Sequence, residues 1–122
     1  MSYHVLVAED EEELAEVFKD ILEMNGFGVT LCSDGAKALA TFVESPDRFD
    51  LVLTDMSMPH RDGRDVALAV REISPATPVI LATGYGDELT EEDKHNLGIT
   101  SCLTKPVKLT DLLREIKLHL KQ

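Results

Sequence analysis

Charged residues stand at the ends of three short apolar segments of the chain. Glu9 and Asp10 follow the first segment, Asp55 ends the second, and Lys105 follows the third. Because the carboxyl ends of neighbouring strands in a parallel sheet lie side by side, we expect these three acids and one lysine to share a pocket. Carboxylate oxygens are ligands that Mg²⁺ prefers, and the compact charge of lysine suits phosphate oxygens. The pattern therefore indicates a site for Mg²⁺ and a phosphoryl group. The three segments are Val5–Ala8, Phe49–Thr54 and Cys102–Thr104.

Each of these residues has a simpler interpretation when it is taken alone. Asp55 could cap a loop, Lys105 could be a surface lysine, and Glu9 and Asp10 could belong to an acidic helix start together with residues 11–13. Their coincidence at three strand ends favours the site. Two carboxylates about 5 Å apart repel by roughly 3 kcal/mol at an effective dielectric of about 20, so a divalent cation should stabilise the fold. We expect residues 11–13 to be the solvated start of the helix.

Five apolar runs predict the strands that must position these residues. Val, Ile and Leu dominate the runs without strict alternation, which is typical of strands covered on both faces. Helical patterns separate the runs, so the chain predicts a parallel sheet with right-handed crossovers. The predicted strands are His4–Ala8, Gly28–Cys32, Leu51–Thr54, Val79–Ala82 and Ser101–Thr104.

The predicted helices differ in their apolar content. The last one carries the clearest stripe, whereas the fourth has Leu89 as its single apolar residue between Asp87 and Asn96. Few buried contacts imply low local stability, so we expect a mobile acidic segment between the fourth and fifth strands. The stripe of the last helix is Leu109, Leu112, Leu113, Ile116 and Leu120.

Composition limits the class of protein. A chain of 122 residues with 43% hydrophobic and 29% charged residues fits one globular domain. Its net charge of −11 argues against nucleic-acid binding, which needs a basic surface, and its apolar runs are too short to cross a bilayer. Cys32 and Cys102 lie in predicted strands and are interpreted as buried, reduced thiols of a cytoplasmic protein. The 4 histidines share no metal-site spacing and are interpreted as surface residues.

Five short motifs then appear in a fixed order, each after the expected strand or loop. Any one of them is weak, but together they make the chain resemble the receiver domain of two-component response regulators, from His4 to about Leu120. The resemblance implies a single receiver domain over residues 1–122, with a doubly wound α/β fold and a five-stranded parallel sheet of order 2-1-3-4-5. The motifs are Glu9-Asp10, Asp55 with Pro59, Asp62-Gly63, Thr83-Gly84 and Lys105-Pro106.

The resemblance also implies a role for each acidic residue. Asp55 is expected to accept a phosphoryl group from the phosphohistidine of a histidine kinase or a histidine phosphotransfer domain, as an aspartyl phosphate. Asp10 is expected to bind Mg²⁺ directly, and Glu9 through a water or as a second carboxylate. The resemblance assigns a further ligand to the backbone carbonyl of Ser57.

Two more residues are expected to contact the phosphoryl group. Lys105 should pair with Asp55 before phosphorylation and with a phosphate oxygen afterwards, and Pro106 resembles the cis-proline of the family. The hydroxyl of Thr83 should bond to the phosphoryl group and draw the following loop inward. Most receivers carry an aromatic residue where this chain has Cys102, so Tyr85 is the candidate substitute and could shield the acyl phosphate from water.

Other functions remain as alternatives. A phosphohydrolase with an aspartyl nucleophile would need an acid–base Asp at position 57, where this chain has Ser57. A flavodoxin-like protein would need a Ser/Thr/Gly-rich loop after the first strand, and a degenerate receiver would lack the complete acidic site. The domain could be a free-standing regulator or a receiver cut from a hybrid histidine kinase. We expect a monomer or weak dimer, no nucleic-acid or membrane partner, and self-phosphorylation and autodephosphorylation rather than turnover of an external substrate.

Overall fold

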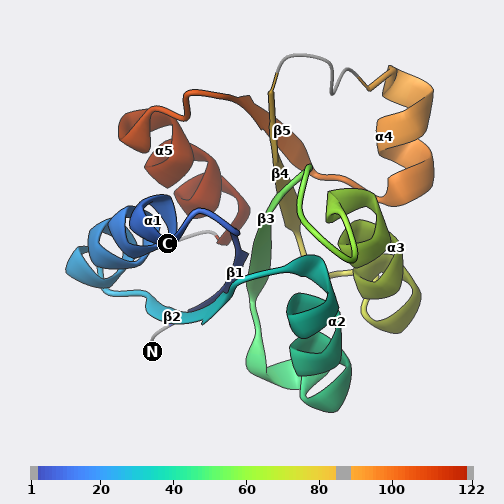
Figure 1. Ribbon diagram of the computed structural model, residues 1–122, viewed down its shortest axis with the longest axis horizontal. Coiled ribbons are helices and arrows are strands. Elements are labelled where there is room, and N and C mark those ends of the chain that lie inside the picture. The colour runs from blue at the N-terminus through green and yellow to red at the C-terminus, as the bar shows by residue number, and fades with distance from the viewer. Residues whose placement is uncertain (1–2, 85–88, 121–122) are drawn as a thin grey trace.

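Five parallel strands form one sheet in the order β2-β1-β3-β4-β5, which confirms the predicted topology. The structure, a computed structural model, describes residues 3–84 and 89–120 (Figure 1). The outer strand β2 pairs with β1, and β5 forms the opposite edge of the sheet. The strands are β1 His4–Ala8, β2 Gly28–Cys32, β3 Leu51–Asp55, β4 Val79–Thr83 and β5 Ser101–Thr104.

Two strands are one residue longer than predicted. β3 includes Asp55 and β4 includes Thr83, because their pairing continues to those residues. The N–H of Met56 donates to the carbonyl of Ala82 at 2.9 Å, and the N–H of Lys105 donates to the carbonyl of Thr83 at 2.7 Å. Two of the residues predicted to do chemistry are therefore the last residues of strands, where the ladder fixes their position.

Helices cover both faces of the sheet (Figure 1). Phe18 and Leu22 of α1 pack with Leu112 and Ile116 of α5 in one core, and α2 and α3 form the second core on the other face. The apolar spacing read from the sequence thus corresponds to buried helix faces. The helices are α1 Glu12–Met24, α2 Gly35–Glu44, α3 Gly63–Ile73, α4 Glu91–Leu97 and α5 Leu109–Leu120, with a 3₁₀ turn at Pro46–Arg48.

The fourth helix is short and weakly buried. Thr90 caps α4 in a capping box with Asp93, and none of the residues of α4 is buried. This agrees with the scarcity of apolar residues in the sequence. Whether the segment is mobile stays a prediction, and Asp87 lies outside the described residues. No described helix is both long and apolar enough to cross a membrane.

The start of α2 lies against the loop that follows β3. Asp34 caps the helix, since its side chain accepts a hydrogen bond from the N–H of Lys37 at 2.8 Å. A Cβ atom on Gly35 would stand 1.9 Å from the carbonyl oxygen of Arg61. Position 35 therefore requires glycine, because only a residue without a side chain permits this approach of two backbone segments.

One expectation about an individual side chain was wrong. Cys102 is only partly buried, because it lies near Lys94 and Glu91 of α4, a helix with no buried residues. Cys32, on the opposite edge strand, packs against α2 and is buried as predicted. His4 is partly exposed, and its ring is hydrogen-bonded to Thr30 Oγ1 at 2.7 Å and packs edge-on against Phe49. Both cysteines are free thiols, as expected.

Candidate functional site

Three acidic side chains meet at the carboxyl end of β1 and β3. Each of Glu9, Asp10 and Asp55 offers a carboxylate oxygen, and these oxygens lie within 4.8 Å of one another. Glu9 and Asp55 are each 3% exposed, while Asp10 is open to solvent. Parallel pairing of β1 with β3 brings the two strand ends together, so the cluster follows from the topology. Residues 11–13 are exposed, and α1 begins at Glu12, as expected for a solvated helix start.

The raised pKa of Glu9 shows that this arrangement destabilises the ionised form of its carboxyl group. Its burial raises the pKa of the carboxyl group to about 7, and the charges of Asp55 and Asp10 act in the same direction. The N–H of Glu11, which donates to Glu9 Oε2 at 3.0 Å, and the charge of Lys105 oppose the rise. A buried carboxyl group held partly protonated near neutral pH is one that a divalent cation would stabilise in its ionised form.

Lys105 neutralises the buried carboxylate at the end of β3. Its Nζ lies 2.6 Å from Asp55 Oδ1, and its side chain remains 32% exposed against 2% for Asp55. Burial lowers the pKa of Lys105, but the hydrogen bond and the negative charge of Asp55 outweigh it and raise the pKa above its ordinary value. The lysine is therefore charged, and the sequence-based expectation of an ion pair with Asp55 is confirmed.

The chain around Lys105 ties the last two strands together. The peptide bond between Lys105 and Pro106 is cis, as the resemblance implied. The N–H of Lys105 bonds to the carbonyl of Thr83 at the end of β4. Thr83 is partly buried and lies beside Thr104 in the register of the sheet. Lysine and threonine thus occupy adjacent strand ends on one side of Asp55.

The loop after β3 lies close to the carboxylate of Asp55. The N–H of Ser57 donates to Asp55 Oδ1 at 3.4 Å, and Ser57 itself is exposed. Met56 is buried, and its carbonyl accepts a hydrogen bond from the N–H of Gly63 at 2.7 Å. The backbone of residue 57 therefore lies next to the acidic cluster, where the resemblance placed a carbonyl ligand. His60 in this loop adopts a φ of 70°.

Two residues contact the backbone of Asp55, and neither contact was predicted from the sequence. The buried hydroxyl of Thr54 donates to the carbonyl of Asp55 at 3.0 Å. Gly63, the first residue of α3, lies so close to β3 that a Cβ atom would stand 2.6 Å from the same carbonyl and 2.6 Å from Leu81 Cδ1. Gly63 belongs to the Asp62-Gly63 motif named from the sequence, and Asp62 caps α3, but the motif does not indicate the contact with Asp55.

The site offers oxygen ligands for a hard cation and a lysine for a small oxyanion beside the carboxylate of Asp55. Carboxylates of Glu9, Asp10 and Asp55 are hard oxygen ligands of the kind that bind Mg²⁺, which fits the expected metal. A cavity of about 460 Å³ opens beside them between α1 and the segment after β5, with Lys105, Pro106 and Val107 on one wall. Tyr85 lies outside the described residues.

The sequence matches a known protein family over nearly its whole length. The family is described as "Response regulator receiver domain", and the match covers residues 5–117. The transcriptional regulatory protein CpxR of Escherichia coli K12 is 36% identical over 118 residues, which is 97% of this chain and 49% of that protein. The sensory transduction protein RegX3 of Mycolicibacterium smegmatis is also 36% identical, over 97% of this chain and 50% of its own length. The chain spans about half the length of these relatives.

Solved structures agree with the fold. A response regulator receiver domain protein from Clostridium thermocellum has a TM-score of 0.91 and 32% identity, covering 98% of this chain and 94% of that one. The chemotaxis response regulator CheY4 of Vibrio cholerae has a TM-score of 0.86 and 26% identity, covering 98% of this chain and 100% of that one. In each comparison the similarity therefore covers nearly the full length of this chain and of the other protein.

Proposed function

Because the chain belongs to the response regulator receiver domain family of two-component systems, we propose that Asp55 is its phosphoacceptor. The donor in this proposal is the phosphohistidine of a histidine kinase or of a histidine phosphotransfer domain. The observation that carries it is the buried Asp55 carboxylate, which lies 2.6 Å from Lys105 Nζ and within 4.8 Å of two further acids. An isolated loop cap would need neither the lysine nor the other carboxylates.

The transfer itself is a simple displacement at phosphorus. A carboxylate oxygen of Asp55 attacks the phosphorus atom, the P–N bond to the imidazole of the donor breaks, and that nitrogen keeps the electron pair. The positive charge of Lys105 is close enough to move from the carboxylate to a phosphoryl oxygen as negative charge arrives. Thr83, at the next strand end, is the proposed hydroxyl donor to another phosphoryl oxygen.

Asp10, Asp55 and the carbonyl of Ser57 would hold Mg²⁺, with Glu9 acting through a water or as a further carboxylate. The ion would neutralise charge on the transferred phosphoryl group. The fit rests on the three hard oxygen donors that converge at this point. Contact of Thr83 and Lys105 with the phosphoryl group would then bias the loops that follow β4 and β5, and this is the proposed switch.

The wider setting belongs to the same proposal. The chain would act in the cytoplasm as a monomer or weak dimer, with slow self-phosphorylation and autodephosphorylation and no external turnover. The curated relatives extend beyond the matched region, so this receiver would act either alone or attached to another domain. The acidic net charge of −11 makes this domain a poor nucleic-acid binder by itself.

The test is the intact mass of the protein after incubation with acetyl phosphate. We expect one Mg²⁺-dependent phosphate on the native chain and none on Asp55→Asn. Asp50→Asn is the matched control, since it removes an acid of the same type that lies at the other end of β3. Addition that survives in Asp55→Asn, or no addition from either acetyl phosphate or a phosphorylated histidine kinase, would refute the assignment.

A further inference from the structure

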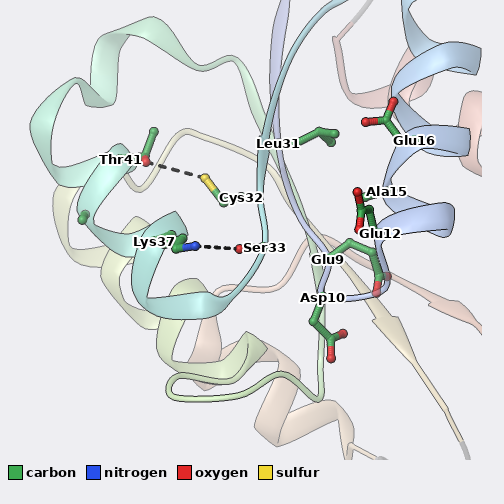
Figure 2. Close-up of a pocket in the computed structure, with 11 residues that line it drawn as sticks. Glu9, Asp10, Glu12, Ala15, Glu16, Leu31, Cys32, Ser33, Lys37 and Thr41 are labelled. Atoms are coloured by element: carbon green, nitrogen blue, oxygen red, sulfur yellow. Dashed lines mark hydrogen bonds between the residues drawn. The ribbon is translucent and has the colours of Figure 1, made fainter.

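A cavity of about 620 Å³ lies at the free edge of the sheet, next to β2. Its walls come from α1 and α2, which cover opposite faces of the sheet (Figure 2). It also contacts three consecutive residues: Leu31, which packs on the α1 side, Cys32, which belongs to the α2 side, and Ser33. Since successive strand residues face opposite ways, a cavity that contacts all of them must lie across the edge of the sheet.

The backbone of β2 presents hydrogen-bonding groups to this cavity. The N–H of Gly28 donates to the carbonyl of Tyr3, and the carbonyl of Cys32 accepts from the N–H of Glu9. The backbone N–H and C=O groups of residues 28, 30 and 32 therefore point toward β1. The N–H and C=O groups of Val29 and Leu31 consequently point outward. Within the described ranges, β1 is the single strand that pairs with β2. An outward row of this kind is a template for one more strand.

The charged side chains around the edge are mostly acidic and favour a basic segment as the additional strand. Glu12 and Glu16 line the α1 wall, and Glu9 and Asp10 line the end of the cavity. Lys37 is the one basic residue of the lining, and its Nζ is hydrogen-bonded to Ser33 Oγ at 3.0 Å. The apolar part of the lining includes Ala15 of α1, Leu31 of β2 and Ala40 of α2. The two alanines leave room between the helices for a backbone.

We propose that this edge groove, defined by Leu31–Ser33 with the facing residues of α1 and α2, binds an extended basic segment of a partner protein. The segment adds to the sheet beside β2, places apolar side chains over Leu31 and Ala40, and places lysine or arginine near Glu12 and Glu16. A second copy of this chain is a poor occupant, because edge-to-edge pairing would bring the same acids of both copies together.

The edge groove reaches the acidic site at one end. Glu9 and Asp10 line the groove and also belong to the cluster that contains Asp55. An occupant whose basic residue lies at that end gains from the exposed charge of Asp10 when no cation neutralises it. Binding of the segment and binding of a divalent cation should then weaken each other by the same factor.

A short capped peptide in which lysine and valine alternate is the probe, followed by ¹⁵N NMR of the full chain and by calorimetry. We expect shifts at Val29 to Ser33 and slower amide exchange of Leu31, while the amides of Thr30 and Cys32 are protected throughout. The same peptide with glutamate in place of lysine should not bind. Shifts confined to other surfaces, equal binding of the glutamate peptide, or dimerisation through β2 would overturn the proposal.

Paired variants separate the edge groove from general charge effects. Glu12→Gln with Glu16→Gln should weaken the lysine peptide roughly fivefold to tenfold, since it removes two solvent-exposed ion pairs. Glu13→Gln with Glu23→Gln changes the net charge equally on exposed positions of α1 that do not line the groove, and should leave the affinity unchanged. Ala40→Trp, at an exposed position, should block the groove without unfolding the chain. Equal losses in both double variants, or full binding to Ala40→Trp, would refute the proposed surface.

Discussion

The raised pKa of Glu9 makes a quantitative prediction about the metal-free protein. The pKa is about 7 in the folded chain against an ordinary value of 4.5. At low pH the carboxyl group is protonated in the folded and in the unfolded chain, so its ionisation does not lower the free energy of unfolding. As the pH rises from about 4.5 to about 7, the unfolded chain releases this proton first, so the free energy of unfolding falls. The stability contributed by protonated Glu9 is therefore present in acid and lost through pH 7.

Glu9→Gln should remove this pH dependence. The full difference in pKa corresponds to at most about 3.4 kcal/mol, and the exposed neighbour Asp10 admits water that screens the charges, so we expect about 1–2 kcal/mol. Without metal, the variant should match the native chain near pH 5 and exceed its stability near pH 8. Glutamine keeps the oxygen that accepts the N–H of Glu11, so packing changes little.

The assay is urea unfolding in the presence of a chelator at both pH values. Glu13→Gln is the matched control, because it removes the same charge from an exposed position and should change stability by no more than about 0.5 kcal/mol. If the curves of Glu9→Gln and the native chain run parallel from acid to alkaline pH, the reasoning about burial and like charges is wrong.

Three further variants test the surroundings of Asp55. Lys105→Gln should destabilise the metal-free chain by about 1–2 kcal/mol in urea unfolding, because it leaves a buried carboxylate unpaired; the exposed Lys108→Gln should not, and equal effects would contradict the ion pair. Gly63→Ala should cost about 1–3 kcal/mol and slow phosphorylation from acetyl phosphate, since its Cβ displaces the backbone of Asp55; native stability and rate together would show that the contact relaxes freely. Tyr85→Ala should shorten the life of the aspartyl phosphate by mass spectrometry, and an unchanged lifetime would exclude shielding.

Much of the fold and site could be predicted because both depend on strand ends. Buried parallel strands are near-continuous apolar runs, so each predicted strand of the sheet matches an observed one within a residue. Glu9, Asp55 and Lys105 were recognisable as charges that end such runs. The resemblance supplied the strand order and the role of each residue, which the apolar pattern alone does not contain.

The features that could not be predicted depend on how closely segments far apart in the sequence approach one another. Nothing local in the sequence states that α3 begins against the carbonyl of Asp55, or that the hydroxyl of Thr54 bonds there. The partial exposure of Cys102 likewise depends on α4, which buries none of its residues, whereas α2 covers Cys32 on the opposite edge strand. Two cysteines in similar predicted strands thus differ in burial according to which helix covers each strand.

The contact between Gly35 and Arg61 limits how this chain can vary. Two backbones already touch where α2 begins and the loop after β3 passes, and any side chain at position 35 would occupy the place of a carbonyl oxygen. The loop that carries Ser57 and Arg61 therefore has no room to move toward the start of α2. A related chain with a larger residue at this position should also differ in the length or path of that loop, so the two positions should change together among homologues.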